Sequence, residues 1–100
     1  MTEKLTELTE RFDAIVLDVL GPIRMSKRVD SASMAELLRV LDELATTLAD
    51  APSVPRKLVG DLWFIFTSML AEAGHAKDPQ PILAAAWEVQ EKLARIFGPF

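Results

Sequence analysis

The most constraining feature of the sequence is an uncharged stretch of ten residues between Asp61 and Glu72. Its bulky start, LWFIF over 62–66, permits three interpretations: a membrane anchor, a buried core helix, or a surface that meets a partner. Ten helical residues extend only about 15 Å, half the hydrocarbon thickness of a bilayer, and charges close both ends. We therefore expect no membrane span, and interpret the stretch as part of a buried helix.

Length and composition limit the class of protein. One hundred residues are enough for an ordinary hydrophobic core, so we expect a single helical domain over 1–100. The chain has no cysteine, which excludes disulfides and thiolate chemistry, and from its charged N-terminus we expect no secretory signal. We expect a cytoplasmic protein. A net charge of −4 argues against nucleic-acid binding, because a phosphate backbone is bound by a surplus of Lys and Arg.

Apolar residues at spacings of three and four predict helices over about 3–20, 34–50, 55–73 and 79–97. Gly21-Pro22 is expected to end the first helix. A capping box, Ser33 with Glu36, is expected to begin the second. The segment 21–32 is then the longest loop between helices. Ser53 and Asp78 are the expected caps of the third and fourth helices.

The third predicted helix is apolar around nearly its whole circumference, and no segment has the pattern of a strand. These features predict an all-α fold, a four-helix bundle with the third helix central. The expected core includes the bulky residues of the apolar faces. They are Phe12, Leu41, Leu62, Phe66, Met69, Trp87 and Leu93.

No catalytic or cofactor motif is present. Glu72 and His75 match the Glu-x-x-His spacing of di-iron bundles, but such a site needs a second motif and two further Glu residues. His75 is the only histidine, and no nucleophile elbow or phosphate loop occurs. We therefore predict no catalytic residues, no metal and no cofactor, so the chain is more readily a binding protein than an enzyme.

Two polar features are candidate contacts for a ligand or partner. Gln90 lies within the apolar arc of the fourth predicted helix, where an unpartnered amide costs about 1–3 kcal/mol, so something should bond it. The segment 21–32 contains Arg24, Lys27 and Arg28, and these cations are candidates for an acidic partner or a phosphate.

One enzymatic alternative starts from Arg11, Arg28, Arg39 and Gln90. These residues resemble the set with which the all-helical chorismate mutases, which are of similar size, bind a dicarboxylate between helices. The resemblance covers isolated residues and no continuous motif, and Gly21-Pro22 interrupts the chain where that family keeps one first helix. It implies a small helical enzyme only if the four residues share a pocket.

The leading hypothesis is a non-catalytic helical protein that acts through protein–protein contact, most simply as a homodimer. Gly60, Phe64, Thr67 and Ala71 share one side of the third predicted helix, where a large aromatic residue stands among small ones. We expect this side to meet a second copy; the alternative is that 21–32 folds over it. A further alternative is an acidic inhibitor of the immunity or antitoxin kind, which would bind a basic partner through carboxylates of the first two helices.

Overall fold

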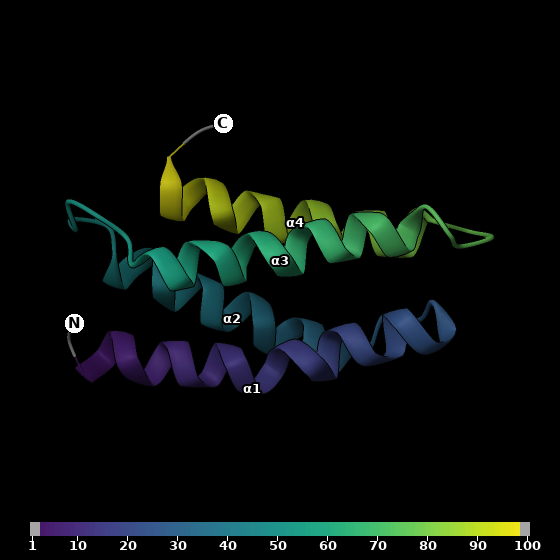
Figure 1. Cartoon of the computed structure of the whole chain (residues 1–100), viewed down its shortest axis with the longest axis horizontal. Helices are drawn as coiled ribbons and strands as arrows, with labels where there is room; N and C mark the ends of the chain where they lie inside the picture. Colours follow the sequence, from purple (N-terminus) through teal and green to yellow (C-terminus); the bar gives the residue numbers. More distant parts are fainter. Residues whose placement is uncertain (1–2, 99–100) are drawn as a thin grey trace.

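The computed structural model describes residues 3–98, which form four α-helices and contain no strand. They are α1 Glu3–Ser26, α2 Ser31–Thr47, α3 Arg56–Ala73 and α4 Gln80–Phe97. Figure 1 shows them side by side along the long axis of a molecule that measures 41 × 27 × 19 Å. The prediction of an all-α four-helix bundle is confirmed. The ends of the predicted 1–100 domain, residues 1–2 and 99–100, lie outside the described range.

The helices are arranged in the cyclic order α1, α2, α4, α3, and each packs mainly against its two neighbours. The prediction that the third helix is central is therefore wrong, because α3 lies at a corner between α4 and α1. Four helices of similar length around one core leave each helix an inner and an outer side. The outer side of α3 therefore faces solvent even though it carries almost no charge.

α1 continues through Gly21-Pro22, where the sequence predicted its end. Pro22 removes one helical hydrogen bond, to the carbonyl of Asp18, but Asp18 is exposed, so water can reach that carbonyl. The additional turn buries Ile23 completely. The gain from burying this side chain offsets the missing bond, and tertiary packing thus overrides the local stop signal.

The end of α1 shortens the connection to α2. Lys27 has a left-handed φ of 53°, and its N–H donates to the Ile23 carbonyl at 3.0 Å. The prediction of a long 21–32 loop is wrong, because only 27–30 separates the two helices. The longest connection is instead 48–55, between α2 and α3.

Asp30, rather than Ser33, caps α2. The Asp30 carboxylate accepts the Ser33 hydroxyl at 2.6 Å and the Ser33 backbone N–H at 3.1 Å. These two bonds, the hydroxyl first, lower the pKa of Asp30 below its ordinary value. The predicted capping box of Ser33 with Glu36 is therefore wrong, because the helix begins earlier, at Ser31.

The other two caps differ from each other. α3 follows Pro55 with no capping hydrogen bond from a side chain, so Ser53 is not its cap. The N-cap of α4 is Pro79 rather than Asp78, but the Asp78 carboxylate, one residue earlier, accepts the backbone N–H of Gln80 at 3.1 Å.

The core within residues 3–98 consists entirely of apolar side chains. Six of the seven predicted core residues are buried: Phe12, Leu41, Leu62, Phe66, Met69 and Leu93. Trp87 is the exception, since 50% of its surface is exposed. The apolar arc of α4 is wider than the contact that α2 and α3 make with it, so its edge remains in solvent.

Candidate interaction surface

α3 presents an uncharged surface to solvent. Gly60, Phe64, Thr67 and Ala71, hereafter the Phe64 face, are all exposed, and Phe64 keeps 51% of its surface accessible. These are the residues that the sequence predicted as an interface. The Thr67 hydroxyl donates to the Trp63 carbonyl at 2.8 Å, so the one polar side chain of the face is satisfied within its own helix.

The α1 edge of the Phe64 face carries a cation, apolar side chains and, around a shared hollow, the carboxylates Asp13 and Asp61. The guanidinium carbon of Arg24 lies 5.6 Å from the centroid of the Phe64 ring, a cation–π contact. Leu17 is 72% exposed and borders, with Phe64, a hollow of about 200 Å³. The alternative that 21–32 folds over this face as a loop is wrong, because the segment is helical to Ser26 and Phe64 stays half exposed.

At its other edge, α3 forms a second uncharged strip together with α4. Each helix contributes four residues at spacings of four, three and four, which we call the tryptophan stripe. They are Val59, Trp63, Phe66 and Leu70 of α3, and Leu83, Trp87, Gln90 and Ala94 of α4. Trp63 and Trp87 are 43% and 50% exposed, and the other six are less exposed.

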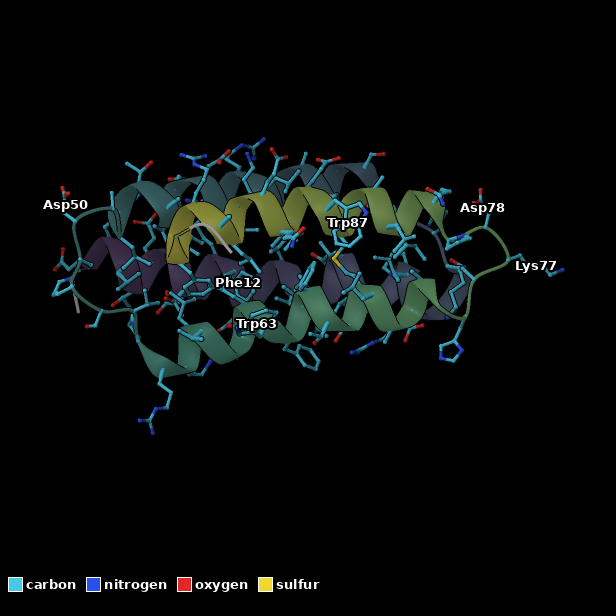
Figure 2. The ribbon with its side chains drawn as sticks, turned by 90° about the horizontal axis from the view of Figure 1, so that it is seen from above. Phe12, Asp50, Trp63, Lys77, Asp78 and Trp87 are labelled. Atoms are coloured by element: carbon cyan, nitrogen blue, oxygen red, sulfur yellow. The ribbon has the colours of Figure 1, made fainter. Side chains whose placement is uncertain are left out.

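Three aromatic rings connect the two helices across the stripe. The Phe66 centroid lies 5.9 Å from that of Trp63 and 6.4 Å from that of Trp87, both in tilted arrangements. Figure 2, which looks onto α3 and α4, shows the two tryptophans arising from different helices. Sequence reasoning missed this surface because it assigned Trp87 to the core; the excess width of the apolar arc of α4 was the available signal.

Gln90 belongs to this stripe and is half-buried. The expectation that its amide needs a partner assumes burial, whereas the side chain is only half-buried. Among residues 3–98, no buried side-chain nitrogen or oxygen lacks a hydrogen bond. Gln90 is therefore a polar group in an otherwise apolar strip, and water can satisfy it while the strip is open.

The outer surface of α2 is organised differently, by ion pairs with both neighbouring helices. Glu43 accepts bonds from Arg11 of α1 at 2.9 Å and from Lys4 at 3.2 Å. Asp42 accepts from Arg95 of α4 at 2.5 Å and from Lys92 at 3.0 Å. The bond from Arg11 is the main cause that lowers the pKa of Glu43, and the bond from Lys4 adds to it.

The cations predicted as partner contacts are dispersed by the fold. Lys27 donates to Glu72 of α3 at 2.5 Å, which lowers the pKa of Glu72. Arg24 lies over Phe64, and Arg28 is exposed in the connection to α2. Lys27 and Arg24 thus tie the end of α1 to α3, and the three do not form one anion site.

The four residues of the enzymatic alternative do not meet either. Arg11 and Arg39 both bond Glu36 of α2, whereas Arg28 lies in the α1–α2 connection. Gln90 lies on the side of α4 that borders α3, in the tryptophan stripe. The shared pocket that the resemblance required is not formed.

Three further findings concern ligands and relatives. Within residues 3–98, no group of three or more His, Asp or Glu side chains is placed to hold a metal ion. None of the helices in that range combines the length and apolar character needed to cross a membrane. Comparisons with protein-family models, curated proteins and solved structures found no match to this chain.

Proposed function

We propose that this protein acts through protein–protein contact, beginning with self-association through the outer surface of α3. The observation that carries the proposal is the uncharged surface of that helix between Asp61 and Glu72, with half-exposed aromatic rings at both of its edges. Leaving such rings in water forgoes roughly 25 cal/mol for each Å² that a partner would bury. A protein surface with this composition is typical of an interaction site.

The structure offers less support for the alternatives. An acidic inhibitor would have to rely on the exposed carboxylates of α1, because Glu36, Asp42 and Glu43 of α2 are already paired with cations of the same chain. An enzyme resembling chorismate mutase would need Arg11, Arg39 and Gln90 around one ligand, and they lie on different sides of the bundle. Self-association uses the surface that the chain leaves unused.

The test is sedimentation of the wild type across a wide concentration range. We expect a dimer of twice the 11.1 kDa chain mass that dissociates on dilution. Thr67→Glu places a charge in the middle of the outer surface of α3 and should weaken the dimer without unfolding the chain. Ala32→Glu, an equal charge at an exposed position in the first turn of α2, is the control and should leave the dimer intact. A wild type that stays monomeric at millimolar concentration would refute self-association.

A further inference from the structure

The tryptophan stripe has the pattern of a helix-packing seam in which Trp63 and Trp87 remain 43% and 50% exposed. Its two rows repeat at spacings of four, three and four, as in the seams of packed helices. Phe66 lies beside Trp87, and Leu70 borders a hollow of about 370 Å³ together with Leu83. In this antiparallel register Trp63 is level with Gln90, so the one polar residue of the stripe is at its centre.

We infer that two copies associate about a two-fold axis with their tryptophan stripes facing each other and Gln90 near the centre of the contact. This inference rests on the proposed self-association and assigns its centre to the α3–α4 edge, with the Phe64 face at the rim. A two-fold axis that runs along the stripe places α3 of each copy over α4 of the other. Both helices are then covered at once.

The available area favours a second copy over a single partner helix. The two tryptophans and the half-buried members of the stripe expose on the order of 400 Å² per copy, judged from the usual area of such side chains. The Phe64 face adds on the order of 250 Å² on the same estimate. A lone helix on the stripe would bury about 800 Å² in total, below the range of about 1,200–2,000 Å² for specific interfaces. A second copy that covers both surfaces reaches the lower end of that range.

Gln90 gives the contact a preferred register. Outside the dimer its amide is reached by water, but a facing stripe removes that water. An amide buried without a partner is unfavourable, so the dimer should keep the one register in which Gln90 is hydrogen-bonded. Apolar residues alone would tolerate sliding along the seam.

The first experiment uses the intrinsic fluorescence of the unmodified protein. The chain contains two tryptophans, and both belong to the stripe. Dilution through the Kd should shift their emission to longer wavelength and increase quenching by acrylamide. Dissociation observed by sedimentation without a change in emission or quenching would overturn the inference and leave self-association standing.

The second experiment compares charges introduced at the two edges of α3. Trp87→Glu should raise the dimer Kd by about 100-fold or more, as for a central aromatic anchor, and Phe64→Glu by about 10-fold or less. Gln90→Glu is nearly isosteric at a half-buried position and should raise the Kd at least about 10-fold. It replaces Trp87→Glu as the test of the stripe if that variant does not fold. Circular dichroism checks folding, and Ala32→Glu is the control.

The outcomes separate the two proposals. A dimer disrupted more by Phe64→Glu than by the stripe variants would contradict the stripe and retain self-association through the Phe64 face. A wild type that never dimerises would contradict both.

Discussion

The outer surfaces of α2 and α3 use their polar and apolar residues in opposite ways. On α2, Asp42 and Glu43 each bond two cations, from α4 and α1 respectively. On α3, no charged residue occurs between Asp61 and Glu72, and Phe64 remains half exposed. The charges of α2 are used to join helices of the same chain, whereas Trp63 and Phe64 of α3 keep 43% and 51% of their surfaces in solvent.

The difference in pairing sets what association would cost at each surface. A partner that approached α2 would have to break or desolvate ion pairs already formed, which is costly. A partner that approached the edge between α3 and α4 would meet apolar groups and one amide, Gln90 of α4, which would need compensating hydrogen bonds once removed from water. The uncharged surface is therefore where association costs least.

The largest expected effect tests whether the outer aromatic residues of α3 are needed for the fold. Leu62, on the inner side, is completely buried, so Leu62→Ala should lower the free energy of unfolding by about 2–5 kcal/mol. Phe64→Ala should cost less than about 1 kcal/mol in the monomer, since half of the ring is already in water and alanine favours the helix. Chemical denaturation at low protein concentration measures both. If the two substitutions lowered the free energy of unfolding equally, the outer surface of α3 would belong to the core. The contrast between the outer surfaces of α2 and α3 would then be wrong.

A smaller effect is expected at Gly60. A Cβ added there would meet nothing within 4 Å, and the residue lies inside a helix. Gly60→Ala should therefore stabilise the monomer by about 0.5–1 kcal/mol. Gly21 of α1 does not provide a matched comparison, because Pro22 follows it and disfavours a helical residue that carries a Cβ. Destabilisation by Gly60→Ala would show that the fold itself requires the glycine of α3.

The smallest effect concerns the ion pairs. The folded-state pKa of Glu43 is lowered chiefly by Arg11, and that of Glu72 by Lys27. Their contribution is present above the ordinary carboxyl pKa of about 4.3 and is lost as the pH falls through the lower folded-state value. Thermal melts from pH 6 to pH 3 should show less loss for Glu43→Gln than for the wild type, and molar salt should reduce the difference. Glu7→Gln, at an exposed position of α1, is the control and should follow the wild type. If Glu43→Gln and the wild type lost the same thermal stability between pH 6 and pH 3, the ion pairs of α2 would not contribute to the stability of the fold.

Periodic apolar spacing predicted the four helices and most of the core, because a buried stripe must recur at every turn. Local stop and cap signals were less informative. Pro22 did not end α1, since burial of Ile23 continues the core stripe beyond it. Ser33 did not cap α2, since Asp30, three residues earlier, is the cap. Stop and cap signals each affect about one helical turn, and burial of one large apolar side chain can contribute more free energy than such a signal.

The candidate surface was predicted in part. The exposure of Gly60, Phe64, Thr67 and Ala71 agrees with their expected outward position, although no finding tests their contact with a second copy. The tryptophan stripe was missed, because a helical wheel shows which residues share a side but not how far the neighbouring helices reach around it.

The sequence by itself determined that the chain forms four amphipathic helices, that Leu62 and Met69 point inward, and that α3 has no charge between Asp61 and Glu72. These follow from residue order, because side-chain direction repeats every 3.6 residues. Only the tertiary structure decided that α3 lies at a corner, that Trp63 and Trp87 share an edge, and that the acids of α2 are paired. Those outcomes depend on which helices are neighbours and at what level their residues meet, and periodicity within one helix carries no information about either.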